Sequence, residues 1–291
     1  MKHTPKVTAI LVTFFILAQL IGLSIISSYI DKTKTTETGK LTWKELPSIA
    51  GMKMERPEIE PKTTIIYVTI ALIIGTTFLL LIIKHKKMLL WKVWFLIAVT
   101  MCMQIAFKAK LPNTPALIIA LILGIWKTFK PNILIHNFTE LFIYGGLAAI
   151  FVPILNIFYA YMLLIIISAY DMYAVWKSKH MIKMAKFQTK TGIFAGLLIP
   201  YTLTKSIKKQ KTKKTKTIKT AVLGGGDIGF PLLFSGTILV LKGWAPALIT
   251  TGCATIALLI LLSLSKKGKF YPAMPFLTIG CATGHLISLL I

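Results

Sequence analysis

Three carboxylates stand apart from the other acidic residues of this 291-residue chain. Six of its nine acidic residues fall between positions 31 and 60, and only Glu140, Asp171 and Asp227 lie elsewhere. All three occur in strongly apolar sequence, where a carboxylate costs roughly 2.5–3.5 kcal/mol to insert into a bilayer. A carboxylate retained in such sequence is commonly functional or paired, so these positions are the first candidates for chemistry.

Asp171 and Asp227 are placed to act as a pair. Asp171 lies six residues before Lys177, which follows one apolar run, and Asp227 lies six residues after Ala221, where the next run begins. At 1.5 Å per helical residue, both are expected about 9 Å from the same membrane boundary. Two carboxylates that meet there cannot both ionise readily, so they share one proton, and the sequence leaves open which one holds it. The ionised Asp can activate a water while the protonated Asp polarises a scissile carbonyl.

The composition places the chain in a membrane. Hydrophobic residues make up 55% of it, charged residues 15%, and the mean hydropathy is +0.75. A soluble domain of this size cannot bury so much apolar surface, whereas spanning helices need apolar runs of about 20 residues. The net charge of +25 comes from lysines between these runs. That pattern suits orientation in a membrane and contact with anionic lipid, and without an aromatic-basic platform it argues against nucleic-acid binding.

We predict an all-α membrane protein with nine transmembrane helices. The fifth and sixth form a nearly continuous apolar run, which we divide near Pro153 and Asn156 because proline removes a helical hydrogen bond. The expected regions are 1–176 with six helices and a polar external loop at 31–62, a basic cytoplasmic loop at 177–220, and 221–291 with three helices. The predicted spans are Val7–Ile30, Thr63–Ile83, Met88–Phe107, Leu111–Trp126, Ile133–Ile154, Ile157–Trp176, Ala221–Leu241, Trp244–Leu264 and Tyr271–Ile291.

The lysines predict the orientation of these spans. With the N-terminus inside, the basic loop 177–220 and most lysines near helix ends fall on the inner side, as the positive-inside rule requires. The C-terminus is then outside. We therefore expect an N-in, C-out protein of the cell membrane, with its site near the cytoplasmic side.

Short motifs flank both aspartates. The glycine triplet of 224–227 (GGGD) opens the seventh span, where glycines let the backbone unwind and another chain approach closely. Tyr170 precedes Asp171, and its phenol can donate a hydrogen bond to a carboxylate or line a cleft. The stretch 271–275 (YPAMP) opens the ninth span with two prolines. Each motif taken alone is weakly specific.

Together the three motifs resemble the presenilin and signal peptide peptidase family of intramembrane aspartyl proteases. The stretches YDMYAVWKSKHMIKM at 170–184 and GGGDIGFP at 224–231 are most similar to the archaeal presenilin homologues. The resemblance covers the whole chain in span number and motif order. It implies that Asp171 and Asp227 are the catalytic pair and that no metal or organic cofactor is needed. It also implies a set of residues that shape the active site: Tyr170, Gly224, Gly226, Pro272, Ala273 and Met274, with Met274 where the family has a leucine of similar volume.

The resemblance also implies the class of substrate, which is a transmembrane helix of another membrane protein. Such a helix must unwind before it can be cut. The family's behaviour implies that the unwound segment adds a strand to strands of the enzyme, for which Ile193–Pro200 and Ala221–Leu223 are the candidates.

Two other functions stay open. The prepilin and preflagellin peptidases also carry a Gly-x-Gly-Asp element, although nine spans and the other two motifs argue against them. A cation or proton transporter could use the aspartates as a relay, because broken helices also serve transporters. A zinc protease is disfavoured, since the sequence has no His-Glu-x-x-His motif and its three cysteines lack metal-ligand spacing.

The remaining polar residues of the apolar runs receive structural interpretations. Asn137 three residues before Glu140 is typical of a helix N-terminal cap, with a substrate-path or proton role for Glu140 as the alternative. Four histidines are expected at or outside the inner helix ends, and His285 is expected to make a polar contact between helices. These four are His3, His85, His136 and His180.

Overall fold

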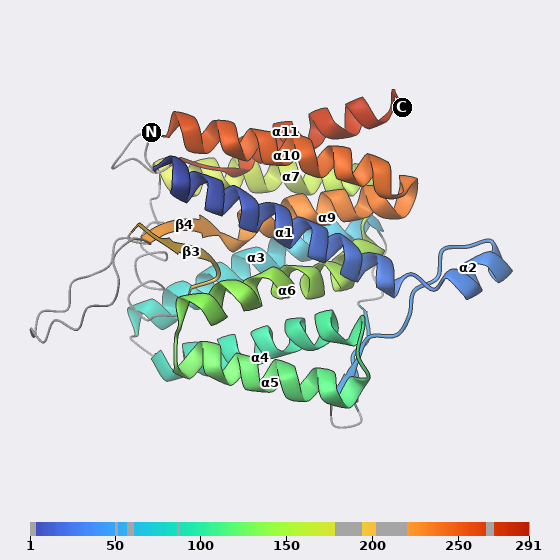
Figure 1. Ribbon diagram of the computed structural model, residues 1–291, viewed down its shortest axis with the longest axis horizontal. Helices are drawn as coiled ribbons and strands as arrows, with labels where there is room; N and C mark the ends of the chain where they lie inside the picture. Colours follow the sequence, from blue (N-terminus) through green and yellow to red (C-terminus); the bar gives the residue numbers. More distant parts are fainter. Residues whose placement is uncertain are drawn as a thin grey trace, which may run out of the picture.

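The computed structural model describes residues 4–49, 52–56, 61–85, 88–177, 194–201, 220–265 and 271–290. Within these residues, long helices run roughly side by side, and a short two-stranded sheet lies at one end of the bundle (Figure 1). The long helices are α1 (Pro5–Tyr29), α3 (Pro61–Lys84), α4 (Met88–Lys108), α5 (Asn113–Phe129), α6 (Ile133–Phe151), α7 (Ile157–Met172), α9 (Gly225–Lys242), α10 (Trp244–Leu264) and α11 (Met274–Ser288). The short elements are α2 (Lys32–Thr38), β1 (Ser48–Ile49), β2 (Met52–Lys53), β3 (Gly196–Pro200) and β4 (Thr220–Gly224).

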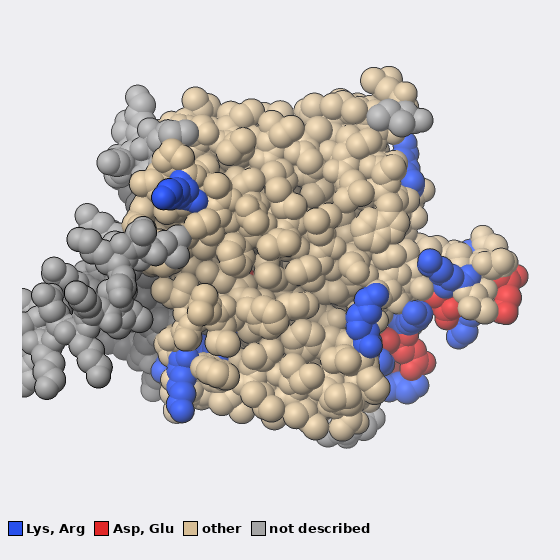
Figure 2. Space-filling view, in the orientation of Figure 1, with Lys and Arg blue, Asp and Glu red and all other residues tan. Residues whose placement is uncertain are grey.

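Several helices meet the length and hydropathy that a membrane span requires. Among the described residues, six segments do so: Pro5–Tyr29, Leu89–Lys108, Ile133–Ile154, Ile157–Lys177, Gly225–Lys242 and Trp244–Leu264. The apolar segments Thr69–Ile82 and Asn113–Phe129 are shorter. On the face shown in Figure 2, basic side chains gather toward the two ends of the molecule and acidic side chains toward one of them. The protein is therefore an integral, multi-pass membrane protein.

The division between α6 and α7 is confirmed. The α6 helix ends at Phe151, and a single 3-10 turn, Val152–Ile154, separates it from α7. The Asn156 side chain then caps α7 by accepting a hydrogen bond from the Tyr159 N–H at 2.9 Å. Proline and a capping asparagine thus end one helix and begin the next, as the sequence predicts.

The seventh predicted span begins too early. Residues 220–224 form strand β4, and helix α9 starts only at Gly225. Glycines are poor helix formers, and the residues before them gain hydrogen bonds by pairing with β3 in an antiparallel register that matches Gly196 with Gly224. The strand expected at Ala221–Leu223 is confirmed, as is a strand within 193–200, of which Ile193 lies outside the described residues.

The ninth predicted span also begins too early. The α11 helix starts at Met274, after Pro272, and Pro275 occupies an early helical position where its missing N–H costs no helical hydrogen bond. The proline-containing stretch therefore lies before the helix and at its first turn.

The core joins the first helix to the C-terminal part of the chain. The α1 helix packs against α6, α9 and α10, and α11 packs against α7, α9 and α10. The largest buried cluster draws on these helices and on both strands of the β3–β4 sheet. The sheet is thus part of the core, and the start of α9 is held between α1, α6 and α7.

Small residues allow α10 and α11 to approach closely. A methyl group added at Gly284 of α11 would lie 2.6 Å from the Cα of Thr250, and one at Gly280 would lie 2.9 Å from the Cα of Ala254. Both glycines therefore face the backbone of α10, in the way that small residues bring membrane helices together.

We predict that Gly284→Ala destabilises the protein by about 1–3 kcal/mol, because the added methyl group must push α10 away. Thermal unfolding in detergent would measure this as a lower Tm. Gly252→Ala on α10 is the matched control, since a methyl group there meets no heavy atom within 4 Å. Equal melting temperatures for the two variants would contradict the close approach.

Candidate active site

The structure brings Asp171 and Asp227 to the same end of the bundle. Asp171 is the penultimate residue of α7, and Asp227 is the third residue of α9. The two helices pack against each other, and the carboxyl groups are near enough to interact electrostatically. The expected position of Asp227, six residues into a helix, is wrong because α9 begins at Gly225. Both aspartates nevertheless lie near helix ends: Asp171 near the end of α7, and Asp227 near the start of α9, which directly follows strand β4.

Backbone amides at the start of α11 hold Asp171. The Met274 N–H donates to Asp171 Oδ2 at 3.1 Å, and the Ala273 N–H lies near the same carboxyl group and favours its charged form. The N-terminus of a helix offers unpaired N–H groups and a partial positive charge, which both favour a carboxylate. One turn earlier on α7, the Ser168 and Thr278 hydroxyls lie 2.7 Å apart and join α7 to α11. The 272–274 stretch therefore touches Asp171 through its backbone, which a change from leucine to methionine does not alter.

The glycines before Asp227 differ in what they contribute. The Gly224 N–H lies near the Asp227 carboxyl group and favours its charged form, and Asp227 occupies the third helical position, as the acidic residue of a capping box does. A methyl group at Gly224 would lie 3.2 Å from Asp227 Oδ2, and one at Gly225 would lie 2.9 Å from the Tyr144 hydroxyl. At Gly226 the nearest atom would be 3.4 Å away, on the Phe230 ring. The structure therefore restricts Gly224 and Gly225 more tightly than Gly226.

The first helix supports the start of α9. Pro231 lies inside α9 and has no N–H, so the carbonyl of Asp227 loses its helical partner four residues on. Gln19 of α1 is fully buried and donates its Nε2 to the carbonyl of Ile228 at 2.9 Å. Gln19 does not figure in the sequence analysis, although a lone amide in an apolar run of this length is a signal for a polar contact inside the bundle.

Tyr170 joins α7 to α3. Its hydroxyl lies 3.2 Å from Thr76 Oγ1, on the apolar helix that precedes α4. The residue thus lies next to the aspartate in sequence and makes a hydrogen bond with a different helix.

The capping role expected for Asn137 and Glu140 is wrong. The α6 helix begins at Ile133 and is capped by the Asn132 side chain, so both residues lie inside the helix. Glu140 is 1% exposed and pairs with Lys127 of α5, whose Nζ lies 2.6 Å from Glu140 Oε1. Lys127 is 2% exposed and also donates to Thr139 Oγ1 at 2.9 Å and to a backbone carbonyl of α6.

Side chains of α6 bind the outer edge of β3. The ring Nε2 of His136 lies 2.7 Å from the carbonyl oxygen of Gly196. Asn137 donates to the Leu198 carbonyl at 2.8 Å and accepts from the Leu198 N–H at 3.0 Å. His136 lies in the first turn of α6, near the helix end as predicted, and its ring is buried against the sheet.

The structure describes two of the other four histidines, and both agree with the prediction. His85 is exposed at the end of α3, as expected. His285 makes the expected contact between helices, with Nδ1 2.8 Å from the Tyr161 hydroxyl. His3 and His180 lie outside the described residues. Within the described ranges, no group of three His, Cys, Asp or Glu side chains could hold a metal ion.

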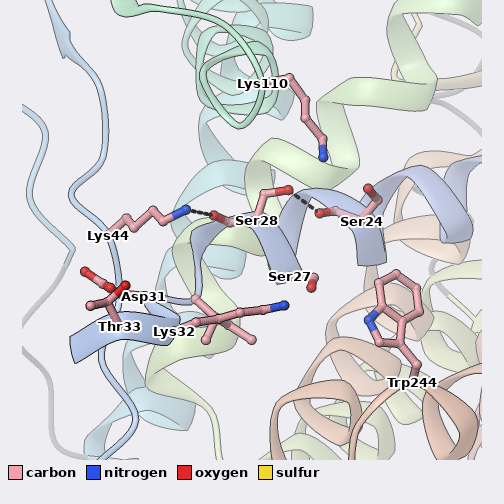
Figure 3. A pocket seen from close by; sticks show the side chains of 10 residues that line it. Ser24, Ser27, Ser28, Asp31, Lys32, Thr33, Lys44, Lys110 and Trp244 are labelled. Atoms are coloured by element: carbon pink, nitrogen blue, oxygen red, sulfur yellow. Dashed lines mark hydrogen bonds between the residues drawn. The ribbon is translucent and has the colours of Figure 1, made fainter. Parts of the chain in front are cut away.

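A polar pocket, seen from close by in Figure 3, lies at the opposite end of α9 from Asp227. Its volume is about 410 Å³, and it lies between the end of α1 and Trp244 at the start of α10. Three lysines line it, together with serines of α1, and Lys44 donates to the carbonyl of Ser28 at 2.9 Å. Helix α9, about 27 Å long at 1.5 Å per residue, separates this end from Asp227. The pocket is therefore remote from the aspartates.

Comparisons with known proteins agree with this arrangement. The sequence profile described as "Signal-peptide peptidase, presenilin aspartyl protease" matches residues 41–291. Two solved structures of a presenilin family intramembrane aspartate protease, in space groups C222 and P2, each share the fold with a TM-score of 0.61 and 17% identity. Each match covers 97% of this chain and 97% of the other. A comparison with curated protein sequences finds no match.

The family match covers most of the chain and contains both aspartates and the 272–274 stretch. The shared fold extends over nearly the full length of both proteins. The chain therefore belongs to the signal-peptide peptidase and presenilin family of intramembrane aspartyl proteases.

Proposed function

We propose that this protein cleaves transmembrane segments of other membrane proteins with Asp171 and Asp227 as its catalytic dyad. The observation that supports this most is the convergence at one point of the three motifs. Asp171 receives the amides that begin α11, and Asp227 lies at the start of the neighbouring helix α9. Segments about 50 residues apart in the sequence thus surround one pair of carboxyl groups.

The proposed reaction is general acid–base hydrolysis by a pair that shares one proton. The ionised aspartate takes a proton from a water as the water oxygen attacks the scissile carbonyl carbon. The protonated aspartate donates its proton to the carbonyl oxygen. Collapse of the tetrahedral intermediate breaks the C–N bond. The aspartate that took the water proton gives it to the leaving nitrogen, and the other aspartate takes back a proton from a hydroxyl of the intermediate, so the dyad again holds one proton. Neither a metal nor an organic cofactor takes part in this scheme, and the shared proton is assigned to neither residue.

The sheet supports a particular site for the unwound substrate. Both backbone groups of Leu198 are bonded to Asn137, so the ladder between the strands uses the neighbouring residues of β3. In an antiparallel pair, hydrogen-bonding direction alternates along the strand, so the N–H and C=O of Val222, opposite Leu198, point away from β3. We propose that the substrate adds a strand along this free edge of β4, which leads directly to Gly224 and Asp227.

We also propose the full membrane arrangement. We propose that nine helices cross the membrane, with the N-terminus inside and the C-terminus outside. Each predicted span overlaps a long helix of the described residues, although α9 and α11 begin later than predicted. The basic loop 177–220 then lies in the cytoplasm between the regions 1–176 and 221–291, in contact with anionic lipid. The dyad is near the cytoplasmic face of the cell membrane. We also propose that, within its family, the chain is most similar to the archaeal presenilin homologues.

We predict that Asp171→Asn and Asp227→Asn each lower cleavage by about a thousandfold or more, because each removes one half of the acid–base pair. The assay uses purified protein in lipid vesicles with a fluorescent single-span substrate, and circular dichroism to check helix content. Glu45→Gln, at an exposed position far from the dyad, is the control and should cleave normally. Cleavage that survives in either folded Asp variant would end the dyad proposal. Ion flux without cleavage would favour the transporter.

We predict that Val222→Pro raises KM about tenfold. Proline removes the N–H that faces the free edge of β4 and leaves the ladder to β3 intact, so a substrate strand loses a main-chain hydrogen bond and meets the proline ring. Leu41→Pro, in the exposed segment after α2, controls for the effect of a proline substitution as such. An unchanged KM for folded Val222→Pro would place the substrate elsewhere.

We predict that a reporter fused to the N-terminus is cytosolic and one fused to the C-terminus is external, since an odd number of spans places the ends on opposite sides. The comparison uses reporters active on one side of the membrane only. A C-terminal reporter that is active only in the cytosol would overturn the proposed orientation.

A further inference from the structure

A buried ion pair lies close to the dyad without a part in the proposed hydrolysis. Lys127 and Glu140 are 2% and 1% exposed and join α5 to α6 with an Nζ–Oε1 distance of 2.6 Å. Removing two charges from water is costly, and apolar side chains of similar volume often stabilise such a position as well or better. Stability alone therefore does not account for a charged pair here.

The second carboxylate oxygen of Glu140 is hydrogen-bonded to a side chain that lies near Asp227. The Tyr144 hydroxyl donates to Glu140 Oε2, one helical turn further along α6. The same hydroxyl lies against Gly225, where an added methyl group would be only 2.9 Å away. Tyr144 also interacts electrostatically with Asp227. One oxygen of Glu140 is thus bound by the Lys127 ammonium. Its other oxygen binds the Tyr144 phenol, which lies beside the turn that contains Asp227.

The preceding turn of α6 is hydrogen-bonded to strand β3. His136, four residues before Glu140, bonds the carbonyl of Gly196, and Gly196 pairs in register with Gly224. Gly196 has φ of +143°, a backbone conformation that favours glycine, and the Ala195 carbonyl beside it accepts the Gly225 N–H at 3.1 Å. One face of α6 therefore holds both the strand that supports β4 and the first residue of α9.

We propose that Glu140, oriented by Lys127, is a positioning residue for hydrolysis, which acts through Tyr144 on the turn that carries Asp227. The inference rests on the proposed function of the dyad. A carboxylate suits the role because both of its oxygens accept hydrogen bonds, one from an ammonium and one from a phenol. The pair sets where the Asp227 turn lies relative to Asp171, and α11 holds Asp171 from the other side.

The test uses Tyr144→Phe, which removes one hydroxyl and keeps both the ring and the ion pair. We predict a kcat lowered about ten- to hundredfold per folded molecule with KM within twofold of wild type, because small displacements of a reacting group reduce rates by up to about a hundredfold. Tyr29→Phe is the matched control. Tyr29 is also buried, and its hydroxyl donates to one carbonyl, that of Ile105 at 2.8 Å, at the other end of α1. Its kcat should equal that of wild type.

A second variant tests whether the residues act in one chain. Glu140→Gln should lower kcat at unchanged KM, and the double variant with Tyr144→Phe should lower it no further than the more severe single change. If Glu140→Gln fails to fold, Tyr144→Phe still decides, since it leaves Lys127 paired.

The outcomes separate this inference from the proposed function. When wild type cleaves and the Asp variants do not, a Tyr144→Phe kcat within twofold of wild type, or no lower than that of Tyr29→Phe, overturns the positioning role alone. A lower yield of folded protein with normal kcat shows a structural role only and also overturns it. Cleavage by the Asp variants overturns the proposed dyad and this inference together.

Discussion

Two carboxyl groups that lie side by side within a membrane protein need hydrogen-bond donors from the fold, because lipid supplies none. In this protein the donors come from the starts of two helices. The Met274 amide at the start of α11 donates to Asp171, and the Ala273 amide lies near the same carboxyl group. The Gly224 amide before α9 lies near the carboxyl group of Asp227. The first N–H groups of a helix have no partner within it, so these bonds cost no helical hydrogen bond. Each carboxyl group consequently lies beside the start of a helix: that of Asp171 beside α11, and that of Asp227 in the first turn of α9.

This requirement determines the surrounding architecture. Because α9 must begin just before Asp227, the residues that precede it are extended, and an extended segment inside a membrane protein needs a partner for its backbone. Strand β3 is that partner for β4, and α6 in turn satisfies the other edge of β3 through His136 and Asn137. Within the part of the chain that the structure describes, no backbone hydrogen bond joins the outer edge of β4 to another element, which supports the proposal that substrate pairs there.

Polar side chains within the apolar helices make hydrogen bonds between the elements that surround the site. Gln19 bonds the start of α9, Ser168 bonds Thr278 of α11, and Glu140 pairs with Lys127 of α5. Such groups are costly to insert into lipid, and each of them bonds another element of the bundle. Close packing through glycines, as between α10 and α11, holds the helices at the distances these bonds need.

The sequence by itself determined the membrane class, the helices, the break between α6 and α7, and the pair of carboxylates worth examining. These follow from local signals: apolar run length, proline, a capping asparagine and the rarity of acids within spans. The tertiary structure alone decided which groups meet. Asp171 and the Met274 amide are 103 residues apart. The sequence around Glu140 is typical of a helix cap, whereas in the fold Glu140 pairs with Lys127 of α5. Likewise, the start of α9 depends on a partner strand that helical periodicity cannot reveal. Partner choice is decided by packing between elements distant in the chain, which no local pattern of residues records.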